Sequence, residues 1–481
     1  MKKFFKKLDL VSWIVILLDL IVTGYFGYVL FRFNMLPTHY VIIAIVLLLI
    51  MTVGSAILIA KRRKKWQKII GYVLSALVII ITGIGIYFVS ITDSFITKSF
   101  TETKKDYYSI NYQVLVKGDS QLTNIDELKD NKVGYFNSLP YLEEAKKELE
   151  KKITFEGIEY DDIVNNFNDL NRNKINAVLI EREVYESLKE TLDTIKSKKY
   201  KILYEFSIQV EQEIEKKEVK GNGFNIYIGG PDFTGTNYDL NMIATVNKDT
   251  RKVLLTSIPR DYHVTIAGKG MKDNLSYAGV WGINTSKKTV ENIFDLDINY
   301  YVKVNTDSLI GIVDTLGGVE FCSDRAFTTT HALIKDTYND TKGPKLDVAK
   351  GCKKYSGIEI LTIARERKAF PGGDRKRQEN CQQIVIKIAN KMASLGSLAN
   401  LNKILDSISK LYTTNVPQEL IQEISKDVIA GNKWSFDQQS VNGSDSKGKV
   451  HLGAVEDYIM IPNAASVDKA KLKIREVMNQ S

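Results

Sequence analysis

Four arginines lie close together in one stretch of the chain, residues 361–388, and they are the residues whose chemistry is clearest. The four are Arg365, Arg367, Arg375 and Arg377. A Pro-Gly-Gly turn separates the two pairs, and Asp374 follows it directly. The planar guanidinium group is permanently charged and matches phosphate oxygens in a way that lysine does not. The cluster is therefore typical of a site for a multiply charged anion such as pyrophosphate. The alternative is a solvated loop, because runs of charge usually mark exposed surface.

Two aspartates and a fifth arginine follow predicted strands elsewhere in the chain. Asp232 lies on a loop after a short alternating strand at Phe224–Gly229, and Asp239 lies on a second polar loop. Arg260 follows the proline that ends a strand predicted at 252–258. Loop carboxylates without competing Cys or His suit Mg²⁺ or Mn²⁺, which one or two carboxylates hold together with phosphate oxygens and water. Aspartate is also common in turns, but together with the four arginines the pair favours a metal–pyrophosphate site.

The order of the predicted strands places the two aspartates and Arg260 at the same edge of a sheet. A strand at 240–246 is joined by the turn NKDT to the strand at 252–258, so Asp232, Asp239 and Arg260 are expected at one rim of a sheet. Farther along, residues 401–429 have helical periodicity, residues 458–462 form a late strand and residues 467–478 a closing helix. We expect this last segment to complete the same sheet or to pack behind it.

Three apolar runs at the N-terminus predict a membrane anchor. They cover residues 11–31, 40–60 and 69–91, and each is long enough for the ~20 residues that a bilayer-spanning helix needs. The basic start MKKFFKK and the basic loop KRRKK are both expected on the cytoplasmic side of the membrane. Everything after the third run is therefore expected outside. Asp19 lies within the first run, where a carboxylate is costly. Packing between helices, or a protonated acid, explains it more simply than a functional role.

Between the anchor and the arginine-bearing region, the pattern predicts a small α/β domain. Residues 97–108 are a polar stem, and candidate strands at 132–136 and 176–180 alternate with helical stretches such as 141–151. This order favours βαβ units and a parallel sheet, weakly similar to solute-binding proteins. We interpret it as a spacer or protein-contact module, although a ligand-binding role stays open. The predicted domains are thus an anchor at 1–93, an accessory α/β domain at 94–217 and a third domain at 218–481.

The composition limits the possible functions. The chain has 481 residues and a net charge of +9, which favours anionic partners without choosing among lipid headgroups, phosphorylated substrates and nucleic acid. Its three cysteines and four histidines show no zinc-binding spacing. Cys322 and Cys352 border the same insertion-like stretch in a segment expected outside the membrane, so a disulfide between them and a pair of free thiols are both open.

Several motifs in one order closely resemble the LytR-CpsA-Psr family. They are NMIATVNKDTRKVLLTSIPRDYHVTI, DNLSYAGVWGI, DINYYVKVNTDSLIGIVDTLGGVEF and LTIARERKAFPGGDRKRQ. The anchor and the intervening domain resemble the capsule-associated CpsA branch. The resemblance implies an extracytoplasmic α/β/α domain with a central mixed sheet, in a Gram-positive type of envelope. It also implies a pocket for a polyprenyl chain and a phosphotransferase that moves a glycopolymer, in this branch capsular polysaccharide, from undecaprenyl pyrophosphate to peptidoglycan.

Position by position, the resemblance assigns roles to this chain. It implies Mg²⁺ ligands at Asp232 and Asp239, pyrophosphate ligands at the arginines, and a motif aspartate at Asp374. The arginines concerned are Arg260, Arg365, Arg367 and Arg377, whereas Arg375 is expected to be solvated. Fixed cations would stabilise the charge that builds up when a sugar hydroxyl attacks the pyrophosphate, with Arg260 acting at the reacting phosphate. Asp261 or Asp374 is expected to act as the general base.

Three positions depart from the family pattern. Many members have arginine where this chain has Asn237, and glutamine where it has Cys381. In a third motif of the family, this chain departs from the usual residues and has Ser-Tyr-Ala at 276–278. Gln382 lies next to Cys381 and is our candidate for the missing pyrophosphate ligand. Single apolar residues near 309–319 and 384–388 are expected in the core, because sequence alone does not separate a lipid pocket from a core.

Two further function classes stay open at this point. A membrane-bound regulator that binds DNA is disfavoured, because the segments expected inside are too short for a DNA-reading module, so nucleic acid is not an expected partner. A non-catalytic assembly factor that contacts capsule proteins is the second alternative, and a phosphatase acting on the lipid pyrophosphate is a variant of the transferase. The expected partners are undecaprenyl-pyrophosphate-linked polysaccharide, peptidoglycan and membrane lipids.

Overall fold

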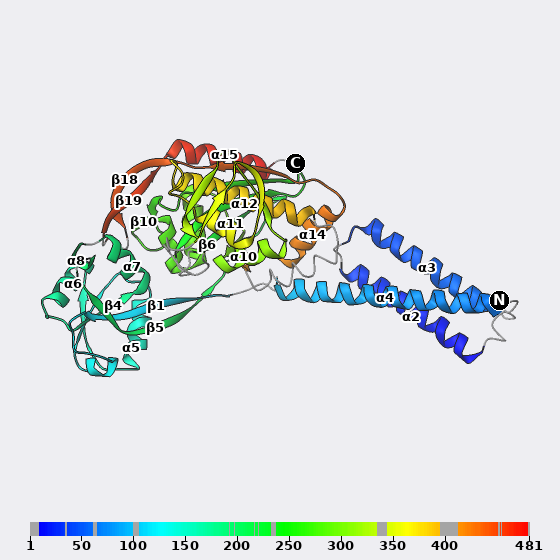
Figure 1. Cartoon of the computed structure of the whole chain (residues 1–481), viewed down its shortest axis with the longest axis horizontal. Coiled ribbons are helices and arrows are strands. Elements are labelled where there is room, and N and C mark those ends of the chain that lie inside the picture. Colours follow the sequence, from blue (N-terminus) through cyan, green and yellow to red (C-terminus); the bar gives the residue numbers. More distant parts are fainter. Residues whose placement is uncertain are drawn as a thin grey trace. The chain divides into compact units, whose positions relative to one another are not determined.

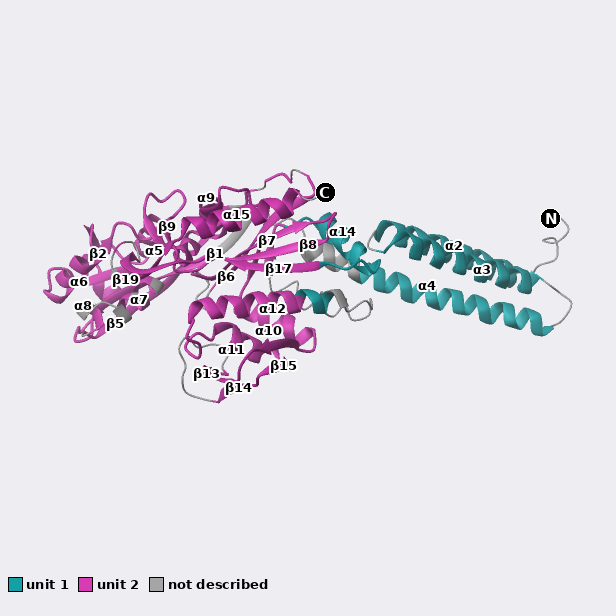
Figure 2. Ribbon diagram, turned by 90° about the horizontal axis from the view of Figure 1, so that it is seen from above, with its two compact units in different colours: residues 1–102, 389–410, 416–434 teal, residues 103–388, 411–415, 435–481 magenta. Residues whose placement is uncertain are grey.

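The computed structural model describes most of the chain, and its residues form two compact units (Figure 2). The described residues are 9–33, 36–60, 65–99, 105–191, 193–196, 198–215, 217–219, 221–231, 237–333, 344–394, 412–450, 453 and 455–479. The first unit covers residues 1–102, 389–410 and 416–434. The second covers residues 103–388, 411–415 and 435–481, and it holds both the accessory sheet and the central sheet. The domain boundaries at 93 and 217 stay predictions.

The first unit contains three helices that are long and apolar enough to cross a membrane, as the sequence predicts. They are α2 (Leu10–Phe33), α3 (Thr38–Ala60) and α4 (Lys65–Ser99) (Figure 1). Asp19 of α2 is fully buried between them. Its carboxylate accepts hydrogen bonds from Ser55 Oγ of α3 at 3.0 Å and Ser75 Oγ of α4 at 2.8 Å. These contacts support the packing explanation for Asp19. The same unit contains α14 (Gln418–Ile429). The helix predicted at 401–429 is wrong at Tyr412–Thr414, which form the strand β16, and residues 401–411 lie outside the described residues.

The accessory sheet has five strands in the order β3-β2-β4-β1-β5. Its strands are β1 (Lys105–Lys117), β2 (Lys132–Phe136), β3 (Glu156–Tyr160), β4 (Ala177–Glu181) and β5 (Tyr200–Glu213). Its helices are η1 (Ile125–Leu128), α5 (Leu142–Glu150), α6 (Ile163–Asn171), α7 (Arg182–Thr191) and α8 (Asp193–Lys196). The predicted parallel pairing is confirmed for β2, β3 and β4. It is wrong for the whole sheet, because β1 and β5 form a long antiparallel pair. The predicted polar stem at 97–108 is likewise wrong from Lys105 onward, where β1 begins. The first residues of β1 are polar, so the sequence does not indicate a strand there.

The central sheet of the second unit has six strands in the order β16-β11-β6-β7-β8-β17. They are β6 (Gly223–Pro231), β7 (Tyr238–Asn247), β8 (Lys252–Ser257), β11 (Tyr300–Val304), β16 (Tyr412–Thr414) and β17 (Ser435–Ser440). Its helices are α9 (Ile283–Phe294), α10 (Thr306–Thr315), α11 (Gly357–Arg365), α12 (Asp374–Ser394) and α15 (Ala464–Asn479). The sheet is mixed, with parallel pairs at β6–β11 and β8–β17 and antiparallel pairs elsewhere. This confirms the predicted fold class.

Alternation along the strands divides the core into two layers. Tyr227, Ile243 and Leu254 point into a cluster that includes residues of α9 and α15. The neighbouring residues of the same strands form a second cluster on the opposite face, together with Val385 and Ile386 of α12. Because successive side chains of a strand point to opposite faces, the domain is a three-layer α/β/α structure with α9 and α15 on one side and α12 on the other.

Several short elements lie outside this sheet. They are β9 (His263–Thr265), β10 (Lys272–Asn274), η2 (Leu275–Trp281), β12 (Val319–Ser323), β13 (Phe327–Ala332), β14 (Lys345–Val348), β15 (Gly351–Tyr355), β18 (Gly443–Val450) and β19 (Val455–Pro462). The late strand predicted at 458–462 exists but pairs with β18 in a separate hairpin, so its expected place in the central sheet is wrong. The late strand of the central sheet is instead β17, whose polar sequence SFDQQS carries little strand signal. The closing helix α15 packs behind β6, β7 and β8 as expected.

Cys322 and Cys352 form a disulfide, which settles the alternatives that the sequence leaves open. The two cysteines face each other in the antiparallel pair β12–β15, and β13 and β14 form a second pair between them. We call residues 319–355, which join α10 to α11, the disulfide insertion. Gln383 of α12 fixes it: the Gln383 side chain accepts from Cys322 N at 2.7 Å and donates to Cys322 O at 3.0 Å.

The disulfide predicts a simple thiol count. Unfolded without reductant, the protein should expose one free thiol, that of Cys381, and after reduction it should expose three. Replacing both Cys322 and Cys352 by serine should lower the free energy of unfolding by roughly 3 kcal/mol, because the bridge closes a loop with a sequence separation of 30. Thiol titration and urea unfolding measure the two effects. Three thiols in the unreduced, unfolded protein would exclude the bridge.

Candidate active site

The sheet edge predicted for the aspartates and Arg260 is formed by the ends of β7 and β8. Arg260 Nη1 donates to Asp239 Oδ1 at 2.6 Å. Arg260 Nε lies 3.5 Å from Asp261 Oδ1 and 3.7 Å from Asp374 Oδ1. Pro259 ends β8 directly before the arginine, which fixes the point at which its side chain leaves the strand. One guanidinium thus faces three carboxylates from three segments of the chain.

The N-terminal turn of α12 brings the motif arginine to the same place. Arg377 Nε donates to Asp374 Oδ1 at 2.8 Å, and Arg377 Nη2 donates to the backbone oxygen of Asp239 at 2.9 Å. Gln378 Nε2 donates to the other oxygen of Asp374 at 2.8 Å. Since Arg377 is 6% exposed, this guanidinium is held rigidly by both segments. The structure therefore joins the arginine motif to the rim of the sheet.

The two candidate bases differ in their protonation. Burial raises the pKa of the Asp261 carboxyl group, and Asp374 and Asp239 raise it further, against the lowering effect of Arg260. Burial also acts on Asp374, but Arg377 and Arg260 outweigh it and lower the pKa of Asp374 to about 2. A general base works best when its pKa lies near the working pH. Of the two, Asp261 has the pKa that is shifted towards neutral pH, whereas Asp374 is held as a carboxylate by Arg377.

Asp374 predicts a pH-dependent contribution to stability. Its folded pKa of about 2 lies below the ordinary value of 3.8, so the contribution is complete above about pH 4 and is lost as the pH falls towards 2. A shift of this size corresponds to about 2 kcal/mol. Asp374→Asn should lower the free energy of unfolding by at least about that amount at pH 6, and the difference from the wild type should shrink below pH 4. Urea unfolding across this range checks it; a difference that does not vary with pH would contradict the ion pair.

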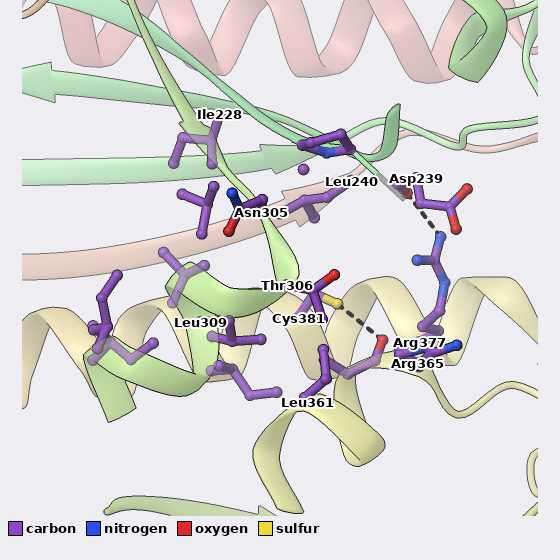
Figure 3. A pocket seen from close by; sticks show the side chains of 18 of the residues that line it. Ile228, Asp239, Leu240, Asn305, Thr306, Leu309, Leu361, Arg365, Arg377 and Cys381 are labelled. Atoms are coloured by element: carbon purple, nitrogen blue, oxygen red, sulfur yellow. Dashed lines mark hydrogen bonds between the residues drawn. The ribbon is translucent and has the colours of Figure 1, made fainter. Parts of the chain in front are cut away.

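A pocket of about 330 Å³ opens beside this charged cluster, between the sheet and α10, α11 and α12. Its apolar lining comes from alternate residues of β6 and β11 and from the facing helices: Ile226, Ile228, Val302, Val304, Leu309, Ile312, Leu361, Ile384, Val385 and Ile388. Its polar lining includes Asp239, Arg365, Arg367 and Arg377. In Figure 3 Asp239, Arg365 and Arg377 gather at one end, and Ile228 and Leu309 lie at the other. The pocket therefore suits a molecule with an anionic head and an apolar tail.

The lining corrects one expectation from the sequence. Leu309 and Ile312 are expected in the core, but they are only partly buried and border this pocket, whereas Val313, Leu316 and the pocket-lining Ile384 are buried as expected. A side chain that lines an apolar pocket has the same sequence signature as one in the core, so periodicity does not separate the two cases.

The arginines of the motif have different surroundings. Arg365 and Arg367 line the pocket at the end of α11 and just beyond it. Burial lowers the pKa of Arg367, and Arg260 and Arg377 lower it further by charge repulsion. Arg375 is about half exposed and pairs with Asp445 at 3.0 Å, outside the pocket lining. The structure thus brings together the four arginines assigned to pyrophosphate and leaves Arg375 at the surface.

Cys381 lines the pocket, and its neighbour Gln382 does not. Gln382 Nε2 donates to the backbone oxygens of Gln439 at 2.6 Å and Leu255 at 3.4 Å, so it ties α12 to β17 and β8 and does not line the pocket. This geometry does not support the contact of Gln382 with pyrophosphate, which stays a prediction. Cys381 does line the pocket, with its Sγ 3.4 Å from the backbone oxygen of Ala364 (Figure 3). Burial raises the pKa of its thiol to about 11, so the thiol is uncharged and unreactive where it lines the pocket.

The carboxylates at the mouth fit a hard divalent cation. Asp239 lines the mouth of the pocket, and only one of its carboxylate oxygens pairs with Arg260 in the described contacts. Mg²⁺ is commonly held by one or two carboxylates with substrate phosphate oxygens and water, so this donor set is suitable. The second predicted ligand, Asp232, lies outside the described residues. A different acidic group, Glu320 beside Cys322 and Cys352, does not qualify because those sulfurs form the disulfide.

Two polar residues near the mouth carry no clear sequence signal. Glu366 lies between the two arginines of α11 and is fully buried, and it accepts hydrogen bonds from Thr330 and from Ala369 N. His331 of the disulfide insertion lines the pocket. Its sequence neighbours give no sign of this, because β13 and β14 bring His331 beside Arg365 and Arg367 only through long-range pairing.

Comparisons with known proteins find a family model, sequence relatives and solved structures to which this chain is similar. A family model described as the LytR_cpsA_psr family matches residues 178–473. The chain is 31% identical over 264 residues to "Polyisoprenyl-teichoic acid--peptidoglycan teichoic acid transferase TagU" of Bacillus anthracis, covering 54% of this chain and 81% of the relative. It is 30% identical over 210 residues to the protein of the same name in Bacillus subtilis, covering 44% and 64%. The crystal structure of B. subtilis TagU matches with 26% identity and a TM-score of 0.41, covering 54% of this chain and 98% of that one.

Proposed function

The chain belongs to the LytR-CpsA-Psr family, and from this premise we propose that it is a membrane-anchored phosphotransferase that moves a glycopolymer from a polyprenyl-pyrophosphate carrier to peptidoglycan. One observation carries the proposal: an apolar pocket ends in a mouth that contains three arginines and a carboxylate. The pocket suits the polyprenyl tail and the mouth suits the pyrophosphate. Curated relatives named as transferases of polyisoprenyl-linked teichoic acid to peptidoglycan support this reading.

The finer parts of the proposal concern the substrate and the location. We propose undecaprenyl pyrophosphate as the carrier and capsular polysaccharide as the polymer, with contacts to capsule assembly proteins through the accessory sheet. We also propose that everything after α4 lies outside the cytoplasmic membrane, since the basic N-terminus and KRRKK loop favour the inside. A reporter fused after residue 90 tests the location: activity of a cytoplasm-only reporter at that position would reverse the topology.

In the proposed reaction, a hydroxyl of peptidoglycan attacks the sugar-linked phosphorus of the carrier. A new oxygen–phosphorus bond forms, the bond to the bridging oxygen of the pyrophosphate breaks, and polyprenyl phosphate leaves. Arg260, Arg367 and Arg377 hold the phosphate oxygens and stabilise the charge that develops on them. Asp261 accepts the proton of the attacking hydroxyl. Asp239, with Asp232, would hold Mg²⁺ or Mn²⁺, which supplies further positive charge to the pyrophosphate when bound.

A reconstituted assay tests this function directly. The full-length protein in nanodiscs is given undecaprenyl-pyrophosphate-linked oligosaccharide and peptidoglycan fragments, and glycosylated peptidoglycan and released lipid phosphate are both measured. Arg260→Ala should reduce transfer by about 10²- to 10³-fold, and chelation of divalent cations should reduce it as well. The matched control is Arg375→Ala in the same motif, whose exposed surface pair should contribute little. Equal activity of the wild type and Arg260→Ala would reject the transferase; lipid phosphate without glycosylated product would identify a phosphatase.

The raised pKa of Asp261 predicts how the transfer rate changes at the acid side of its pH profile. A base must be deprotonated, so transfer should rise with pH through the pKa of Asp261, which burial places above that of an ordinary aspartate. Asp261→Asn should lower kcat/KM by about 10²- to 10⁴-fold, and the remaining rate should lose that acid-side dependence. Steady-state rates from pH 4 to 8 check this. An unchanged profile in Asp261→Asn would remove Asp261 from the role of base.

A further inference from the structure

The disulfide insertion delivers a histidine to the mouth of the pocket through an irregular strand. In the pair β13–β14, Thr328 faces Asp347 and Ala332 faces Lys345, so the register shifts within residues 329–331. A bulge of this kind places extra residues on one strand and re-aims their side chains, and bulges are common beside active sites. His331 is one of the three residues in the irregular segment, and it lines the pocket.

The other two residues of the bulge hold it in place. Thr329 Oγ1 accepts from Leu346 N at 3.0 Å and donates to the backbone oxygen of His331 at 2.9 Å, which replaces the missing ladder contacts. Thr330 N donates to Glu366 Oε2 at 2.5 Å, and its hydroxyl group lies 3.0 Å from both carboxylate oxygens. Glu366 is fully buried and lies between Arg365 and Arg367 in sequence. These hydrogen bonds hold the bulge against the segment that contains Arg365 and Arg367.

The insertion is also fastened at its base. The disulfide Cys322–Cys352 closes β12 against β15, and Gln383 of α12 binds both backbone polar groups of Cys322. Phe327 at the start of β13 packs edge-on against Phe370, with ring centroids 4.7 Å apart. These contacts from α12 and from the segment after α11 leave β13 little freedom to move, so the position of His331 is preorganised.

One nitrogen of His331 has no hydrogen-bond partner within the described part of the chain. Its Nδ1 is buried, and no hydrogen-bond partner reaches it among the residues that the structure describes. A buried polar atom without a partner is costly, and such atoms in native structures call for an explanation. Burial, and then the positive charges of Arg365, Arg367 and Lys368, lower the pKa of the imidazole, with Glu366 opposing them. The ring is therefore neutral near pH 7, and it offers a directed hydrogen bond without adding a further charge to the mouth.

We propose that His331 is a further donor-binding residue, whose Nδ1 forms a hydrogen bond with a non-bridging oxygen of the bound pyrophosphate. This inference rests on the proposed function, because it takes the pyrophosphate to be the group that occupies the mouth. The insertion is then part of the binding site, and its disulfide serves to position that histidine.

The test uses the full-length protein in nanodiscs and two soluble probes, inorganic pyrophosphate and geranyl pyrophosphate, whose affinities are measured by calorimetry. His331→Ala should weaken binding of both by roughly 10- to 100-fold, the usual loss for a hydrogen bond to a charged group. His331→Asn should recover most of the affinity, because its amide nitrogen replaces Nδ1, whereas His331→Gln, whose amide replaces the other ring nitrogen, should not. Thr328→Ala on the same strand is the control, since its hydroxyl group bonds to Asp347 and it does not line the pocket.

A second arm tests the role of the disulfide. Replacing both Cys322 and Cys352 by serine should weaken probe binding, and combining this change with His331→Ala should add little, because the two changes act on the same contact. Thermal unfolding of every variant shows whether it is folded at the assay temperature.

The outcomes separate the two proposals. Unchanged affinity in a folded His331→Ala variant, or equal recovery by asparagine and glutamine, overturns the role of Nδ1 while wild-type transfer still supports the proposed function. If the wild type binds neither probe and transfers no glycopolymer, both proposals fall together.

Discussion

Replacing Arg367 by glutamine should stabilise the folded protein while it removes most of the transfer activity. Burial and the like charges of Arg260 and Arg377 lower the pKa of Arg367, so this cation lies in surroundings that disfavour it when no anion is bound. A neutral side chain of similar length should therefore raise the free energy of unfolding by about 1 kcal/mol, as active-site substitutions often do. Transfer should fall by about 10³-fold, because a fixed arginine supplies much of the stabilisation in phosphoryl transfer.

The opposite signs of the two effects make the measurement decisive. A residue with a purely structural role should lose stability when replaced, and any loss of activity should follow the loss of folded protein. Arg375→Gln is the matched control, since Arg375 is exposed and paired with Asp445, and it should change neither quantity much. Denaturant unfolding and the reconstituted assay are run on the same preparations. A destabilised Arg367→Gln variant that keeps its activity would show that Arg367 does not bind the anion.

Filling the apolar end of the pocket should block long lipid donors. Ile312 of α10 lines the pocket one turn along from Leu309, and tryptophan in its place would occupy space that the proposed polyprenyl tail needs. Each buried methylene contributes about 0.8 kcal/mol, so displacing four or five of them should raise the KM for the lipid-linked donor by at least about 100-fold. The protein should not lose stability, because filling a cavity usually stabilises a fold.

The specific readout for Ile312→Trp is how the increase in KM depends on the length of the donor's prenyl chain. Donors with a short prenyl group should lose less than donors with the full polyprenyl chain, since they place fewer carbons in the pocket. Leu472→Trp is the control, because Leu472 is 60% exposed on α15, which packs against the opposite face of the sheet. The same loss for short and long donors would mean that the tail binds elsewhere. A pocket of about 330 Å³ is near the lower end of the range for ligand sites, so it holds only part of a long chain.

The parts of the fold that the sequence predicts are those with a strong local period. Strands β6, β7 and β8 alternate clearly, and Pro259 marks the end of β8, so the meeting of Arg260 with Asp239 follows from the pattern. The antiparallel pair β1–β5 and the strand β17 are missed because their polar faces resemble loops and their stability comes from neighbouring strands.

The parts of the site that the sequence does not predict depend on long-range contacts. Whether Ile312 lines a pocket or fills a core is decided by what lies opposite it. Gln382 and Cys381 are neighbours on α12, and the rotation of that helix alone determines which of them faces the pocket. His331 reaches the mouth through a bulge that arises from the pairing of β13 with β14. Local sequence carries the chemistry of these residues but not their direction.

The carboxylate of Asp19 ties the biogenesis of the anchor to the insertion of all three helices. Its two hydrogen-bond donors, Ser55 and Ser75, belong to the second and third helices, so the first helix alone would present an unpaired acid to lipid. Both hydrogen bonds form only when the second and third helices are in place, so Asp19 couples the packing of all three helices. A shortened protein that keeps only α2 as its anchor should accumulate poorly unless Asp19 is replaced by an apolar residue.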